Sequence, residues 1–250
     1  GATLAQCANT GVTAAQYGGI EGNAAGQYNA LFSGSTDLIP ETADSYTIGF
    51  VLQPQFLPGF SLTVDYFDIS VEDVISSMPP TVSLNQCLQT GDPQFCSRVN
   101  RDADGSLWAS DDAFITAYNE NIGGLDTSGV DVDLGYQHDV GTMGSLSFRF
   151  NGTYLAELIT TPVSGQYSVG EYDCAGLYGS DCGTPNPEWR HTARVTWDTP
   201  WNVGLSLAWR YFDQVLIDNT SSNPLIGGDY NEVDRQLDAQ NYIDVAATWN

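Results

Sequence analysis

The amino-acid sequence predicts an all-β fold, an antiparallel up-and-down meander that forms part of a large transmembrane β-barrel. Three observations lead to this prediction. Apolar and polar residues alternate along seven short segments, as they do in strands with one apolar face. The links between these segments are short and long in strict alternation. The composition, with 26 Gly, 13 Tyr, 10 Phe and 6 Trp, favours strands and turns over helices.

The seven alternating segments follow one another along the chain. In the first segment, Ile48, Phe50 and Leu52 share one face, and the intervening positions share the other. Because successive side chains of a strand point to opposite faces, each segment presents one apolar and one polar face. The predicted strands cover residues 46–52, 60–66, 130–137, 146–154, 189–197, 203–211 and 243–249.

The links between the predicted strands carry the architectural information. Three are short, and the three that separate them are long and polar. A soluble β-sandwich explains the alternation of side chains but not this sorting of loops by length. An outer-membrane barrel explains both, because it has tight periplasmic turns and long extracellular loops. The short links are residues 55–59, 140–144 and 199–202, and the long links are residues 73–125, 159–187 and 215–240.

The two faces of the predicted strands differ as lipid and water would require. Polar faces carry Ser, Thr, Gly, Asp, Asn and Arg, which suit a wet lumen. All four strand arginines, Arg149, Arg190, Arg194 and Arg210, fall on the polar face. Apolar faces carry large residues, with aromatic side chains near strand ends as in an interfacial girdle. These aromatic residues are Phe60, Tyr136, Trp189, Trp197 and Trp201.

The charge of the chain excludes one class of partner. The formal net charge is -24, and all seven basic residues are arginines. Such an acidic chain repels the phosphates of nucleic acids, so no nucleic-acid partner is expected. No run of about 18 apolar residues occurs, so no transmembrane helix is predicted either.

The cysteines predict an oxidising compartment. Cys87 and Cys96 lie close together in the sequence, as do Cys174 and Cys182, and each pair falls within a polar segment. We predict one local disulfide in each pair, as is typical of periplasmic or cell-surface proteins. A zinc site is the competing hypothesis, although neither pair has C-x-x-C spacing. Cys7 is left without a predicted partner.

Several segments resemble a known family. Residues 38–50, LIPETADSYTIGF, resemble the strand entry of TonB-dependent receptors, and residues 59–69 look like the strand that follows it. Residues 121–136 are similar to the "N.G.....GVDLDL.Y" strand of that family. The loop from residue 87 to residue 105 resembles a Cys-containing extracellular loop of the large alphaproteobacterial-type receptors. The match covers nearly the whole chain.

The resemblance implies a function and its partners. Members of the family form a barrel of 22 strands behind an N-terminal plug and take up a scarce ligand across the bacterial outer membrane. We therefore expect residues 1–250 to be a partial barrel domain of about seven strands, with the plug and the closing strands absent. The implied partners are outer-membrane lipid, TonB through the missing N-terminal region, and a small-molecule or oligosaccharide ligand. A ferric siderophore, a carbohydrate and a cobalamin all remain open, as does a passive porin.

No constellation in the sequence predicts an enzyme or a cofactor. His138 and His191 fall at predicted strand ends, and no G-x-S-x-G motif accompanies them. A weak calcium alternative is Asn100, Asp102, Asp104 and Asp111, which have the spacing of an EF-hand loop, with Gly at its sixth position. A D-x-D-G turn explains the same letters. The alternative function is therefore a secreted or surface-anchored, calcium-dependent β-rich binding protein.

Aromatic residues of the long links are the candidate ligand-binding residues. Aromatic rings stack on sugars and on aromatic chelators. The alternative is that they pack the loops together. The residues are Trp108, Tyr118, Tyr167, Tyr172 and Tyr178.

Overall fold

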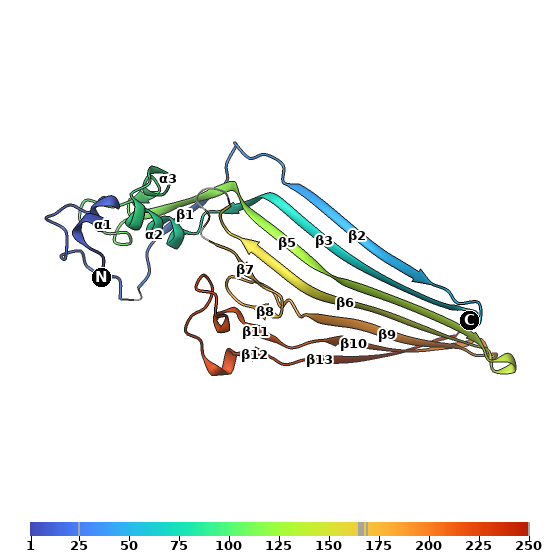
Figure 1. Ribbon diagram of the computed structural model, residues 1–250. Helices are drawn as coiled ribbons and strands as arrows, with labels where there is room; N and C mark the ends of the chain where they lie inside the picture. Colours follow the sequence, from blue (N-terminus) through green and yellow to red (C-terminus); the bar gives the residue numbers. More distant parts are fainter. Residues whose placement is uncertain (25, 165–167, 169, 250) are drawn as a thin grey trace. The chain divides into compact units, whose positions relative to one another are not determined.

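The computed structural model describes residues 1–24, 26–164, 168 and 170–249 (Figure 1). The chain divides into two compact units. The helical unit consists of Gly1–Thr42, Glu72–Gly124 and Thr161–Gly170. The strand unit consists of Ala43–Val71, Leu125–Thr160 and Glu171–Asn250. Each is described separately.

Seven principal strands form the main sheet. Their order across the sheet is β2-β3-β5-β6-β9-β10-β13, which is also their order along the chain (Figure 1). The structure therefore confirms the predicted meander of seven strands. The strands are β2 (Thr42–Leu52), β3 (Phe60–Ser77), β5 (Phe114–Asp139), β6 (Ser145–Thr161), β9 (Trp189–Asp198), β10 (Val203–Phe212) and β13 (Gln240–Trp249).

The short turns gather at one end of the strand unit, as the sorted loop lengths predict. The amide of Gln137 donates to the carbonyl of Gly59, so the turn before β3 lies beside the end of β5. The indole of Trp197 donates to the carbonyl of Met143 over 2.8 Å, which ties the end of β9 to the turn after β5. That turn contains the 3-10 helix η1 (Gly141–Met143).

The long links of the strand unit contain short elements. β11 pairs with β8 and with β12 in a small second sheet, and β7 pairs with β6. These elements are β7 (Tyr172–Asp173), β8 (Leu177–Tyr178), β11 (Val215–Ile217), η3 (Asp218–Thr220), η4 (Glu232–Asp234) and β12 (Gln236–Leu237).

The helical unit departs from the prediction, because residues expected as loop form helices. Thr3 and Gln6 form a capping box at the start of one helix. The longest helix has Pro80 in its first turn and ends at Gly91, whose φ of 69° is the left-handed conformation that glycine adopts most readily. The elements are α1 (Leu4–Asn9), β1 (Ala30–Ser33), α2 (Pro80–Thr90), α3 (Pro93–Cys96) and β4 (Val99–Asn100).

The helical unit has a hydrophobic core of its own. Met78, Phe95 and Val163 are at most 2% exposed and pack together with Cys87. Side chains of α2, α3, β4 and β5 pack against this core. The strands β1 and β4 pair with the first residues of β5. Among the described residues, no helix is long and apolar enough to cross a lipid bilayer.

Candidate functional site

One face of the strand unit is apolar and open. The register places Phe148, Val195, Leu207 and Val245 side by side in one row across four strands. Leu207 is 50% exposed and Val245 is 78% exposed. We call this face, which also carries Leu205 and Trp209, the apolar face. An apolar surface that continues across several strands needs a partner or a lipid environment.

Aromatic side chains mark both ends of the apolar face. Near the short turns, the rings of Trp197 and Trp201 lie 6.3 Å apart. Toward the other end, His191 contacts a cluster of rings, the closest being Trp209 at 4.4 Å. His191 is the third residue of β9, so it lies near the start of that strand, as predicted, and it faces the apolar side. The other rings of this cluster are Phe150, Trp189 and Tyr211.

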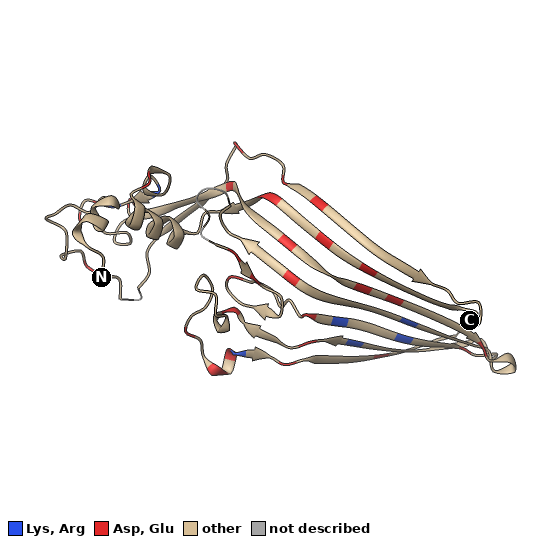
Figure 2. Ribbon diagram, viewed as in Figure 1, with Lys and Arg blue, Asp and Glu red and all other residues tan. Residues whose placement is uncertain are grey.

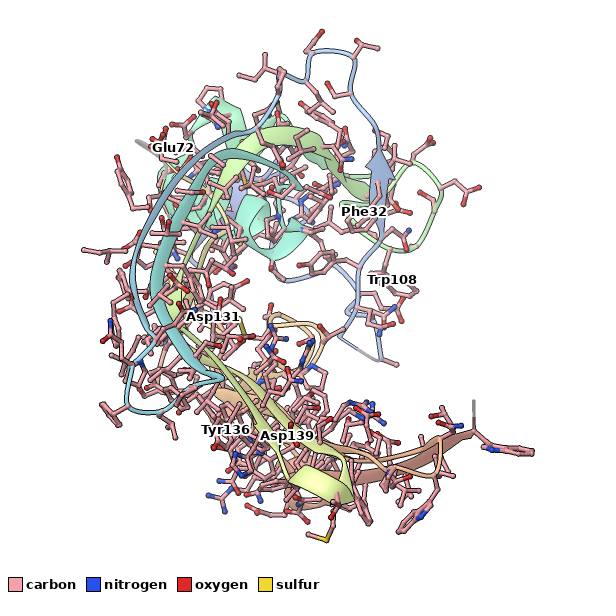
Figure 3. All side chains as sticks on the ribbon, turned by 90° about the vertical axis from the view of Figure 1, so that its right-hand side faces the viewer. Phe32, Glu72, Trp108, Asp131, Tyr136 and Asp139 are labelled. Carbon is pink, nitrogen blue, oxygen red and sulfur yellow. A yellow bond between two sulfur atoms is a disulfide. The ribbon has the colours of Figure 1, made fainter. Side chains whose placement is uncertain are left out.

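The opposite face, which we call the polar face, carries hydrogen-bonding groups. Thr153 donates to the carboxylate of Asp131 over 2.7 Å, and Asn151 donates to the carboxylate of Asp133. A groove of about 360 Å³ runs beside these groups. Its polar lining comes from Asp65, Asp131, Asp133, Asn151, Thr153, Arg190 and Thr192. Figure 3 marks Asp131, Tyr136 and Asp139 along β5 of this unit.

The arginines of the polar face gather on β6, β9 and β10, whereas β2, β3 and β5 carry acidic residues (Figure 2). Arg149 lies directly opposite Arg194 in the β6–β9 register. The guanidinium of Arg210 contacts the Asp244 carboxylate at 2.9 Å, with both side chains about half exposed. Asp133 lies on the same face, and its carboxylate accepts from Asn151, two residues away from Arg149 along β6.

Both predicted disulfides are present. The Cys87–Cys96 bond closes a loop in the helical unit, and the Cys174–Cys182 bond closes one in the strand unit. These four cysteines are therefore not zinc ligands. Cys7 of the helical unit is a free thiol.

A buried carboxylate that the sequence did not predict supports the second disulfide loop. Asp218 is fully buried and accepts the backbone amides of Asp181 and Cys182 over 2.8 and 3.1 Å. Gly179 passes so close that a Cβ there would lie 2.2 Å from the Asp218 carboxylate. No local sequence pattern marks Asp218, because its partners are more than 30 residues away.

The segment with EF-hand spacing forms a turn. One carboxylate oxygen of Asp102 accepts the amides of Asp104 and Ser106, and the other accepts the Ser110 hydroxyl. The Asn100 amide donates to Arg98 and Thr116 instead of turning toward Asp102. Across the part of the chain that the structure describes, no three His, Cys, Asp or Glu residues gather as metal ligands would.

Two of the predicted ligand-binding aromatics lie in the helical unit. The indole of Trp108 donates to the carbonyl of Glu21 over 3.2 Å and lines a pocket of about 460 Å³. The ring of Tyr118 lies 4.8 Å from the guanidinium carbon of Arg98, a cation–π contact. Arg98 is 4% exposed and contacts Glu120 at 2.6 Å. Tyr118 therefore packs against a buried, ion-paired guanidinium.

Two more of these aromatics lie in the strand unit. Tyr172 is 9% exposed and packs with Cys174 and Ile226, and burial raises the pKa of its phenol. The Tyr178 hydroxyl donates to the carbonyl of Asp234. Both therefore join parts of the loops together. The fifth predicted residue, Tyr167, lies outside the described residues.

Comparisons with known proteins agree with this architecture. Residues 8–250 match the family model described as "TonB dependent receptor-like, beta-barrel". No curated protein sequence matches the chain. Among solved structures, a mutant of the ferric enterobactin receptor PfeA from Pseudomonas aeruginosa, in complex with enterobactin, is similar, with a TM-score of 0.53, 13% identity and coverage of 89% of this chain and 26% of that one.

A second similar structure is the FrpB iron transporter from Neisseria meningitidis, with a TM-score of 0.51 and 12% identity. The match covers 88% of this chain and 25% of FrpB, so the chain spans about a quarter of the length of these receptors. At such identities the likeness concerns the fold alone. The family model, which matches nearly every residue, goes further: the chain belongs to the TonB-dependent receptor-like β-barrel family.

Proposed function

We propose that this chain forms part of the wall of a bacterial outer-membrane receptor that takes up a scarce ligand with energy delivered by TonB. The observation that carries the proposal is the pair of opposite faces in the strand unit. The apolar face is open across neighbouring strands, and the polar face carries carboxylates, hydroxyls and arginines. This is the pattern of a barrel wall between lipid and a wet lumen.

Four of the seven principal strands have the length that a bilayer requires, whereas β3, β5 and β6 are longer, with 18, 26 and 17 residues. A tilted transmembrane strand needs about 9–11 residues. β2 has 11 residues, and β9, β10 and β13 have 10 each. Rings of Trp197 and Trp201 lie near one end of the apolar face, and the His191 cluster lies toward the other. Aromatic rings at both ends of an apolar band are typical of the two membrane interfaces.

The proposed ligand is a small molecule such as a ferric siderophore or a carbohydrate. Similar solved structures are named as receptors for ferric enterobactin or as an iron transporter, which supports the first class. Trp108 beside its pocket, and the tyrosines Tyr118, Tyr167, Tyr172 and Tyr178, stay proposed contributors to ligand binding. Residues 1–250 are proposed to be one portion of the barrel, and a plug region elsewhere in the receptor is proposed to contact TonB.

Two measurements test the proposal. Membrane fractionation should place the protein that contains this chain in the outer membrane, with heat-modifiable migration on a gel. Uptake of its ligand should stop when TonB is deleted, which separates an active receptor from a passive porin. A detergent-independent, soluble protein that does not change its migration on heating would contradict the membrane assignment.

A further inference from the structure

The arginines of the polar face are concentrated in an unusual way. The chain has 31 acidic and seven basic residues, and four of the seven lie on three adjacent strands of one face. We call Arg149, Arg190, Arg194 and Arg210 the arginine ladder. All four side chains are exposed. Most of the few cationic side chains of this protein therefore lie on β6, β9 and β10.

The register sets the ladder in three successive rows. Arg149 and Arg194 lie directly opposite each other and form the first row. Arg210 lies opposite Thr192 in the second row, and Arg190 lies opposite Thr153 in the third. Rows on one face of a strand are about 6–7 Å apart, so the ladder extends along the strands over about 13 Å.

Two like charges opposite each other destabilise a sheet unless a counter-charge lies between them. Within the described residues, arginine forms ion pairs only in Arg98–Glu120, Arg210–Asp244 and Arg235–Glu232. Arg149, Arg190 and Arg194 therefore have no carboxylate partner there, and Arg194 donates only to the Ser206 hydroxyl.

Asp244 pairs with Arg210, but the other acidic residues of the same face do not pair with the ladder. Asp131 shares a row with Arg190, but β6 lies between their strands and Thr153 bonds the carboxylate. Two strand spacings separate such positions by about 10 Å. Asp133 is likewise bonded by Asn151. The cationic charge of Arg149, Arg190 and Arg194 is thus available to a molecule on the polar face.

We propose that the arginine ladder binds soluble, multivalent oxyanions, meaning molecules with two or more carboxylate or phosphate groups, on the lumen side of the wall. Guanidinium groups bind carboxylates and phosphates through paired, charge-assisted hydrogen bonds. Rings of Arg select anions in pores, and several weak sites in succession let a solute enter and leave. Next to Arg190, the groove offers the Thr192 hydroxyl, whereas Thr153 and Asn151 already donate to Asp131 and Asp133. The lumen location rests on the proposed function, whereas the binding itself does not.

The test uses the purified receptor that contains this chain, in a non-ionic detergent, with sodium citrate and sodium phosphate as probes. Calorimetric titration at constant ionic strength should show citrate binding, and sucrose should not compete. The double substitution Arg149→Gln with Arg194→Gln should weaken citrate binding by about tenfold or more, because two charge-assisted contacts are lost. The double substitution to Lys should retain most of the binding.

The matched control is Arg235→Gln, which removes an exposed arginine from a loop of the same unit and should leave citrate binding unchanged. A second readout is thermal: without multivalent anions and at low salt, the double Gln variant should melt higher than the parent protein, because repulsion is relieved. Citrate should then raise the melting temperature of the parent but not of that variant.

Equal citrate binding by the parent and the double Gln variant would overturn the proposal, as would no binding of citrate or phosphate to the parent. A lower melting temperature of the double Gln variant, without any effect of citrate on the parent, would also overturn it and assign the ladder to a protein carboxylate. These results are distinct from failure of the proposed function, which is decided by fractionation, gel migration and dependence on TonB.

Discussion

The two units of the chain treat their apolar side chains in opposite ways. In the helical unit, Met78 and Phe95 are at most 2% exposed and pack around the Cys87–Cys96 disulfide. In the strand unit, Ile48 is 75% exposed and Val245 is 78% exposed. The first arrangement removes apolar area from water inside the unit itself. The second leaves apolar area for an outside medium. One unit therefore buries its apolar side chains, and the other exposes them.

This contrast bears on which exposed residues are expected to tolerate substitution. An exposed valine on a soluble protein tolerates substitution, whereas a valine on a barrel wall faces hydrocarbon. In the helical unit the buried apolar residues are therefore expected to be the sensitive ones, whereas in the strand unit we expect the exposed apolar residues to be sensitive as well.

The largest effect is expected for Phe95→Ala in the helical unit. Phe95 is 2% exposed, and removing a packed phenyl ring from a core costs about 3–5 kcal/mol. Hydrogen exchange of α2 and α3 in the purified receptor should therefore accelerate strongly. The control is Phe56→Ala, at a turn residue that is 88% exposed, which should leave exchange in both units unchanged. Unchanged exchange in Phe95→Ala would mean that the helical unit has no cooperative core.

The next effect is expected for Val245→Arg, in the middle of β13. An arginine on the lipid face at the bilayer midplane costs about 2–4 kcal/mol. Equilibrium refolding into lipid vesicles measures this loss. Its neighbour Ala246 faces the opposite side of the strand, so Ala246→Arg should cost far less. Equal costs for the two variants would contradict the assignment of the two faces.

A smaller effect, confined to the helical unit, is expected when Cys87 and Cys96 are both replaced by Ser. Their bond closes a loop with a sequence separation of nine, for which chain entropy predicts about 2.5–3 kcal/mol. Limited proteolysis between α2 and β4 should become faster, and β9 and β10 should stay protected. The same double replacement of Cys174 and Cys182 is the counterpart, and it should loosen the loop between β6 and β9 instead.

The smallest effect concerns the pH dependence of Tyr172 in the loop before β9. Burial raises its pKa above the ordinary value of 10.0. Folding therefore favours the neutral phenol, and the stability that this burial contributes is complete below pH 10 and is lost as the pH rises through the raised pKa. The difference in ultraviolet absorbance between the parent and Tyr172→Phe should show a phenol that ionises above pH 10. Ionisation at or below pH 10 would show that the loop core is open to water.

Much of the strand unit could be predicted from sequence because a barrel wall is a repetitive structure. Each strand needs only an apolar residue at every second position, and each hairpin needs only a short turn. Both are local properties of the chain, so the seven strands and their order were predicted. The two disulfides were predicted for the same reason, because each joins cysteines that are close in sequence.

The helices of the other unit were not predicted, because their stability comes from contacts between distant residues. α2 begins with Pro80 and is 11 residues long. Isolated helices of this length are marginal in water. The core residue Cys87 of α2 packs with Val163, which lies 76 positions along the chain in the link after β6. No periodicity of apolar residues within residues 73–125 indicates this contact with Val163.

Which face of each strand is apolar can be read from the sequence, since the alternation of side chains follows directly from strand geometry. The sequence could not determine which residues of neighbouring strands lie opposite each other. That register is fixed by turn geometry and by packing across the sheet. It places Arg149 opposite Arg194 and Asn151 beside Asp133, and it brings His191 against Trp209. Only the tertiary structure could decide these contacts, because the alternation is preserved when two strands slide past each other by two residues, whereas the pairing of charges is not.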